Sequence, residues 1–188
     1  MTVCNVITTA DNILNLNIVS QLDVSAQTLA QAMRHNADCN LLLTCCNSVM
    51  EDLFRQFAFD CRSTVVEAVN GLIDTSLLKI CRAVSLTDSA GRKTPFAYCA
   101  SGLKVDADGK YNLTYARLPD ELDFDTDVTL PNCKITNRIF TYGVIAEYLR
   151  IVGDYLNSQS WLGKFNQALT VATTSKTDLR LPSRRWLT

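Results

Sequence analysis

The chain has 188 residues, of which 47% are hydrophobic and 20% charged, which fits a globular protein with one well-packed domain rather than a disordered chain. Its 18 basic and 19 acidic residues give a net charge of −1, which argues against binding of free DNA or RNA through the phosphates. The sequence has no run of about 18 apolar residues and no secretory signal pattern, so we expect no transmembrane helix, no membrane partner and assembly in a cytoplasm.

Residues 8–59 predict three helices. The first spans Thr8–Leu22, the second Ser25–Arg34 and the third Asp38–Phe57. The third pattern is the clearest, because apolar residues recur at helical spacing over about five turns and Asp38 suits a helix N-cap. These apolar positions are Leu42, Cys46, Val49, Leu53 and Phe57.

Residues 60–131 predict a β-rich insertion. Segments 63–71 and 80–87 favour strands that end in turn residues, and 96–98 extends the sheet. The strongest hairpin pattern joins 103–105 to 111–115 around the loop Asp106–Gly109, with Tyr111, Leu113 and Tyr115 on one apolar face. Residues 118–131 are acidic and rich in turn residues, and we interpret Asp120–Asp127 as a solvated loop rather than a cation site.

Residues 132–173 predict two further helices. The first carries Ile135, Ile139, Tyr142, Ala146, Leu149 and Val152 at spacings of three and four, and loosens from Gly153 to Ser158. The second places Trp161, Phe165, Leu169 and Ala172 on one face, and we interpret these aromatic residues, together with Tyr142, Tyr148 and Tyr155, as core packing.

The expected fold is therefore α+β and mostly α. The N- and C-terminal helices form a bundle, a small antiparallel sheet is inserted between them, and an extended tail follows. Residues 1–179 would form a single domain, with residues 180–188 as the tail.

Catalytic and metal-binding patterns are not found in the sequence. The single histidine, His35, lies in a polar segment and is expected to be solvated, and the seven glycines are too scattered for a phosphate-binding loop. The eight cysteines form no CxxC pair, so we expect free, mostly buried thiols. The sequence thus predicts no catalytic residue, no cofactor and no metal, although a small cysteine-dependent enzyme stays as an alternative.

The C-terminal peptide differs from an ordinary frayed end. It combines three arginines with Leu181, Pro182, Trp186 and Leu187, whereas disordered tails are usually poor in large apolar residues. Arginine and tryptophan are also the residue types most enriched at binding hot spots. The composition therefore favours a docking peptide.

The order and spacing of these segments resemble the head-to-tail adaptor proteins, also called tail tubular or connector proteins, of short-tailed bacteriophages. The cysteines are not part of the family pattern. The resemblance is carried by Asn40–Leu43 with Phe57 and Phe59, Val69–Asp74, Tyr115–Pro119, Tyr142–Tyr148, Trp161–Phe165 and Leu181–Trp186.

The resemblance implies a structural virion protein of the phage neck. Copies would form a ring, usually dodecameric, beneath the portal protein and join it to a downstream tail or nozzle protein, while viral DNA passes through without specific binding. Portal docking would fall to Leu181, Pro182, Arg184, Arg185 and Trp186. The β insertion, around Asp106–Gly109 and Asp120–Asp127, would project towards neighbouring subunits or a tail protein.

Two other non-enzymatic interpretations are compatible with the sequence. The chain could be another neck component, such as a stopper or tail-completion protein, or a non-viral helical module that binds partner helices. An adaptor should be monomeric alone and form its ring only on the portal, whereas a regulator would work as a small oligomer.

Overall fold

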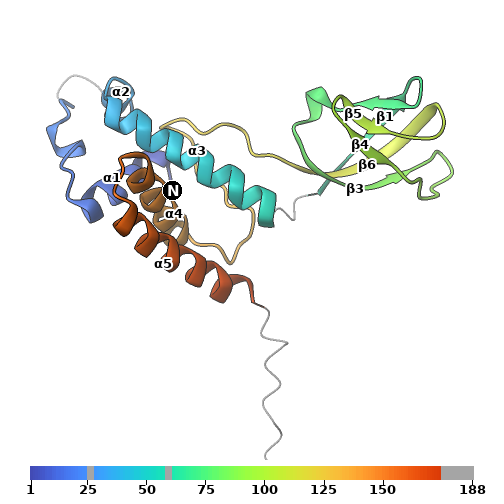
Figure 1. The fold of residues 1–188 in the computed structure, drawn as a ribbon. Coiled ribbons are helices and arrows are strands. Elements are labelled where there is room, and N and C mark those ends of the chain that lie inside the picture. The colour runs from blue at the N-terminus through green and yellow to red at the C-terminus, as the bar shows by residue number, and fades with distance from the viewer. Residues whose placement is uncertain (25–27, 58–60, 175–188) are drawn as a thin grey trace, which may run out of the picture.

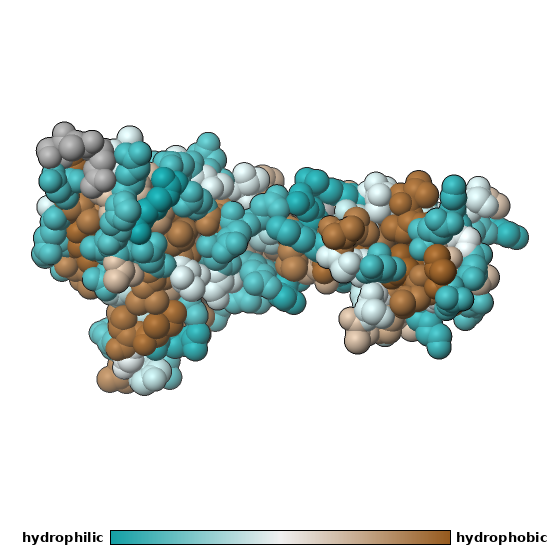
Figure 2. Space-filling model, turned by 90° about the horizontal axis from the view of Figure 1, so that it is seen from above, coloured by the Kyte–Doolittle hydropathy of each residue, from teal (hydrophilic) through white to brown (hydrophobic). Residues whose placement is uncertain are grey.

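A computed structural model describes residues 1–24, 28–57 and 61–174. The fold is α+β, as the sequence predicts, and it is divided into a helical bundle and a β module, residues 61–117 (Figure 1). Figure 2 shows the two parts from above, joined by a narrower and largely hydrophilic connection. Each part has its own cluster of buried apolar side chains.

The N-terminal helices begin and end at different residues from those expected. Helix α1 spans Val3–Leu14 and stops where Asn15 adopts a left-handed conformation (φ 52°). The Asp11 carboxylate then accepts hydrogen bonds from the backbone N–H groups of Ile18 and Val19, which fixes an irregular turn before the short 3-10 helix η1, Val19–Gln21. The predicted continuous helix from Thr8 to Leu22 is therefore wrong, because the polar side chain of Asp11 satisfies the backbone outside a helix.

Helices α2, Leu29–Arg34, and α3, Ala37–Phe57, complete the N-terminal half. Thr28 and Gln31 form a reciprocal capping box, which starts α2 later than the sequence pattern predicts. Asn36, and not the predicted Asp38, caps α3, since its Oδ1 accepts from the N–H of Cys39 at 3.0 Å. The predicted apolar stripe of α3 is confirmed, with Leu42, Cys46, Val49 and Leu53 buried and Phe57 partly buried.

The β module contains two three-stranded antiparallel sheets rather than one. The first has the order β1–β6–β3, from Cys61–Ala68, Gly109–Arg117 and Ile80–Thr87. The second has the order β2–β5–β4, from Leu72–Asp74, Gly102–Lys104 and Ala97–Cys99. A 3-10 turn, η2, spans Ser76–Leu78.

The predicted hairpin between 103–105 and 111–115 is wrong. Strand β5 pairs with β2 and β4, whereas β6 pairs with β1 and β3, so the connection after Lys104 crosses from one sheet to the other. The N–H of Val105 donates to the carbonyl of Gly71 at 2.9 Å, and Tyr111 donates to the carbonyl of Ala107 at 2.8 Å. The predicted apolar face of β6 is nevertheless confirmed, because Tyr111, Leu113 and Tyr115 are all buried.

Two C-terminal helices complete the bundle. Helix α4, Asn137–Ile151, and helix α5, Tyr155–Thr173, pack against each other after a sharp turn at Gly153 (φ 89°). The predicted faces are buried at Ile139, Ala146, Leu149 and Leu169 and only partly buried at Tyr142 and Trp161, whereas at the turn Val152 is exposed and Tyr155 starts α5 with 65% of its surface in solvent. Those two residues therefore do not pack in the core.

Two glycines in these helices differ in the space that surrounds them. A Cβ at Gly143 would lie 2.8 Å from Cγ1 of Val49 and 3.0 Å from the ring of Phe165, whereas a Cβ at Gly163 would meet nothing within 4 Å. We expect Gly143→Ala to lower the free energy of unfolding by about 1 kcal/mol through overpacking, and Gly163→Ala to raise it by about 0.5–1 kcal/mol. Urea unfolding of both variants tests this, and shifts of the same sign would contradict it.

Candidate interaction sites

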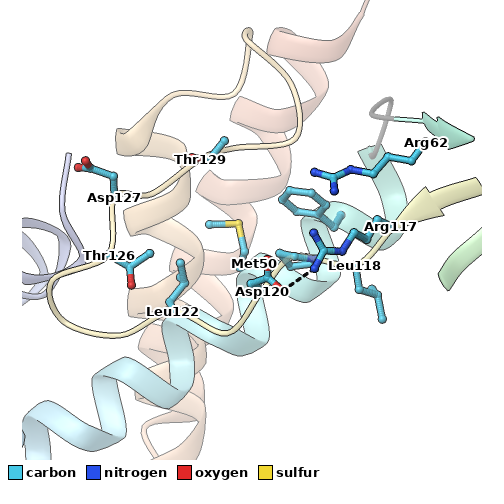
Figure 3. A pocket seen from close by; sticks show the side chains of 11 residues that line it. Met50, Arg62, Arg117, Leu118, Asp120, Leu122, Thr126, Asp127 and Thr129 are labelled. Carbon is cyan, nitrogen blue, oxygen red and sulfur yellow. Dashed lines mark hydrogen bonds and ion pairs between the residues drawn. The ribbon is translucent and has the colours of Figure 1, made fainter. Parts of the chain in front are cut away.

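A pocket of about 310 Å³ lies where the bundle meets the β module. Met50 and Phe54 of α3 form part of its wall, and Arg62 of β1 and Arg117 of β6 enter from the β module. Figure 3 shows both guanidinium groups turned towards this junction pocket. The remaining lining residues come from residues 118–131, which we call the acidic segment.

Asp120 joins the acidic segment to the β module. Its Oδ1 accepts from Lys79 Nζ at 3.1 Å and from Arg117 at 2.8 Å (Figure 3 shows the latter pair). The hydrogen bond from Lys79, together with the positive charges of Arg117 and Lys79, holds the pKa of the Asp120 carboxyl below its usual value. A backbone hydrogen bond joins the same two segments, since the N–H of Leu118 donates to the carbonyl of Lys79 at 2.8 Å. An ionised carboxylate between two cations positions the module and has no proton to exchange at neutral pH.

The acidic segment packs against the bundle instead of projecting from it. Leu122 and Phe124 are buried in the helical core, and the amide side chain of Asn47 both donates to and accepts from the backbone of Leu122. The N–H of Cys4 donates to the carbonyl of Phe124 at 3.2 Å. The predicted solvated loop at Asp120–Asp127 is therefore wrong for its apolar residues, which serve as anchors.

Two further carboxylates of this segment face Arg34 of α2. Arg34 contacts Asp123 at 2.6 Å and Asp125 at 2.9 Å, and its guanidinium lowers the pKa of the Asp123 carboxyl. Within the described residues, no group of three or more potential ligands that could hold a metal ion is found. These ion pairs therefore attach the acidic segment to α2.

The cysteines do not assemble into a reactive site. All eight are free, but only Cys4, Cys39, Cys45 and Cys46 are buried, so the expectation of mostly buried thiols holds for half of them. Burial raises the pKa of Cys39 to about 11 and that of Cys45 to about 12, which keeps both thiols protonated and unreactive at neutral pH. His35 is exposed at the end of α2, as predicted.

One surface groove was missed by the sequence analysis. Tyr142 of α4 and Trp161 of α5 contact each other with ring centroids 5.4 Å apart, and each ring is covered by a cation. Lys164 Nζ lies 3.9 Å from the centroid of Trp161, and Arg138 lies over Tyr142 and donates to its hydroxyl. The rings line an adjoining groove of about 500 Å³ together with Met1, Thr9, Ile13, Asn137 and Thr141. Helical spacing alone indicates core packing and does not distinguish a half-buried groove from it.

The predicted docking residues Leu181, Pro182, Arg184, Arg185 and Trp186 lie outside the described residues. None of the described helices is long and apolar enough to cross a membrane. No known protein-family model and no curated protein matches the chain.

Charge is distributed very unevenly between the parts of the chain. Residues 1–57 and 118–131, which form the N-terminal helices and the acidic segment, carry ten acidic and two basic residues. The β module carries five acidic and eight basic residues. The net charge of −1 is thus the sum of an acidic part of the bundle and a basic β module.

Proposed function

We propose that this chain is a head-to-tail adaptor of a tailed bacteriophage, a structural virion protein without enzymatic activity. Copies form a ring, usually of twelve, below the portal protein, link it to the downstream tail protein and surround the path of the DNA. The protein works in the neck of the virion after assembly in the host cytoplasm.

The observation that supports this proposal most is the division into two separately packed parts (Figure 1). A bundle of the N- and C-terminal helices carries a β module inserted between them, which is the layout that the family resemblance implies. The segment that leads from the insertion back to the bundle contacts both parts, through Asp120 with Lys79 and Arg117 of the β module and through Leu122 with Asn47 of α3, which suits a spacer between stacked rings. A neighbouring assembly can then contact the bundle and the β module at different levels.

Cryo-electron microscopy of the chain mixed with its portal protein tests the proposal. We expect a ring of twelve copies stacked below the portal, with residues 180–188 ordered against it. A chain that stays monomeric and ignores the portal would overturn the assignment. Binding to a completed neck, but not to the bare portal, would favour a stopper or tail-completion protein instead.

The C-terminal peptide provides a single-residue test of the same proposal. We expect Trp186→Ala to weaken portal binding by about 2 kcal/mol or more, roughly a thirty-fold higher dissociation constant, because a tryptophan in a partner pocket is the commonest kind of hot spot. Biolayer interferometry on immobilised portal measures this, with Thr177→Ala as the control. Equal affinities for both variants would remove Trp186 from the docking site.

A further inference from the structure

Two neighbouring hollows on the helical bundle share the side chain of Tyr142. The first is the groove of about 500 Å³ at Tyr142 and Trp161, bordered by α1. The second has a volume of about 470 Å³ and is lined by Ile139 and Tyr142 of α4 and by residues of α5 between Lys164 and Ala172. The amine of Lys164 lies over the ring of Trp161, so Lys164 borders both hollows. We call the two hollows together the bundle groove.

The bundle groove is largely apolar and open to solvent. Val171 leaves 74% of its surface in solvent and Ile13 leaves 39%, although both are large apolar residues. The aromatic side chains of Tyr142 and Trp161 are only partly buried. Apolar and aromatic side chains gathered around a hollow, with a few polar groups among them, are the usual lining of a binding site.

The charged side chains of the bundle groove are both cations. Arg138 lies over Tyr142 and Lys164 lies over Trp161, and no carboxylate among the described residues lines either hollow. Neither cation makes an ion pair within the part of the chain that the structure describes, in contrast to Arg150 of α4, which pairs with a glutamate. Contact with the rings holds both positive charges beside the groove. The groove therefore favours an occupant that carries carboxylates.

The walls of the bundle groove indicate a helix as its occupant. Helices α1, α4 and α5 all contribute lining residues, and their side chains form ridges between which a further helix can pack. On α5 the lining runs from Trp161 to Ala172, a length of about 17 Å at 1.5 Å per residue. About three turns of helix cover this length, with apolar anchors at helical spacing.

Charge and burial argue against other segments of this chain as the occupant. Residues 175–188 follow α5, but they carry four basic residues and one acidic residue, a net charge of +3 that the two cations of the groove repel. The acidic segment has the required charge, but its Leu122 and Phe124 are buried in the core of the bundle. The acidic segment of a second copy is buried in the same way. The occupant therefore belongs to another protein.

We propose that the bundle groove binds an acidic amphipathic helix of a partner protein. Apolar side chains of this helix fill the two hollows, and its carboxylates face Arg138 and Lys164. The inference goes beyond the adaptor function and does not depend on it, because it uses only contacts within the helical bundle.

Three synthetic peptides of about 14 residues test this charge preference on the full chain. They share leucines at helical spacing and differ only at the flanking positions, which are glutamate, glutamine or lysine. Fluorescence anisotropy of the labelled peptides at low salt should show at least about tenfold tighter binding of the glutamate peptide than of the lysine peptide. Equal affinities, tighter binding of the lysine peptide, or no binding of any peptide at about 100 μM would overturn the inference.

Two exposed positions locate the bound peptide. Lys164→Glu should weaken binding of the glutamate peptide by about tenfold and strengthen binding of the lysine peptide, whereas a merely structural defect would weaken both. Val171→Glu should weaken binding of the glutamate peptide by a similar factor, because it places a carboxylate in the second hollow. The matched controls are Lys134→Glu and Leu156→Glu, at exposed positions outside the described lining of both hollows. The controls should bind as the wild type does, and all four variants should keep its circular dichroism spectrum.

A photo-crosslinking residue at the exposed position Gln167 identifies the occupant directly. We expect cross-links to the glutamate peptide. Cross-links between two copies of the chain, or displacement of the peptide by single-stranded DNA, would overturn the inference in favour of a different occupant. A chain that binds the glutamate peptide but forms no ring on the portal would overturn the adaptor function and leave this inference standing.

Discussion

Phe124→Ala is expected to lower the free energy of unfolding by about 3–5 kcal/mol, although the residue lies in an irregular and acidic segment. Phe124 is only 1% exposed, and it packs among the buried residues of the helical core. Its carbonyl accepts from the N–H of Cys4, so the ring and the backbone together join the acidic segment to α1. Removing the ring leaves a cavity that α1 and α3 cannot close without losing these contacts.

Equilibrium urea unfolding, followed by the helical circular dichroism signal, measures this effect. Glu121→Ala is the matched control, since Glu121 is exposed three residues earlier in the same segment, and we expect a change within about 0.5 kcal/mol. A loss below about 1 kcal/mol for Phe124→Ala would show that the segment does not anchor the bundle.

Alkaline pH is expected to destabilise the bundle steeply. Burial raises the pKa values of Cys39, Cys45 and Cys46 in the folded chain, to about 11 for Cys39 and about 12 for Cys45. In the unfolded chain, thiols ionise near pH 8.5, so above that pH the unfolded state binds fewer protons than the folded state and stability falls as pH rises. The stabilisation is fully present below about pH 8.5 and is lost progressively towards the folded pKa values.

Each such thiol contributes about 1.4 kcal/mol per pH unit, so three give a slope approaching about 4 kcal/mol per pH unit between pH 9 and pH 10. Urea unfolding in that range, with a phosphine reductant present, measures the slope. Cys45→Ala should reduce it by about a third, whereas Cys61→Ser, at an exposed position, should leave it unchanged. If Cys45→Ala does not alter the slope, groups other than the buried thiols cause the loss of stability at alkaline pH.

The periodicity of apolar residues predicted where helices and strands form better than it predicted which strands pair with one another. The apolar stripe of α3 and the alternation of β6 are local patterns, and both are confirmed. The pairing of β5 with β2 and β4 was not predictable from the Asp-Gly turn, because it depends on a backbone contact between Val105 and Gly71, which are distant in sequence. The predicted helix boundaries were wrong where side chains satisfied backbone groups, as Asp11 does after the end of α1 and Asn36 does at the start of α3.

The candidate sites were less predictable than the fold. The charges of Asp120–Asp127 indicate a solvated loop, and only the folded chain places Arg34 and Lys79 opposite them. The groove at Tyr142 and Trp161 is formed by three helices, so no single helical pattern contains it. The predicted C-terminal docking peptide lies outside the described residues and stays a prediction.

The register of the first sheet has a consequence for shortening the chain. Cys61, the first residue of β1, is paired with Ala116 at the end of β6, so the β module leaves and re-enters the bundle at neighbouring points. Paired residues of adjacent antiparallel strands lie about 5 Å apart, a gap that a short loop can bridge. The module can thus be replaced by a short loop, and we expect a chain shortened in this way to keep the helical bundle folded.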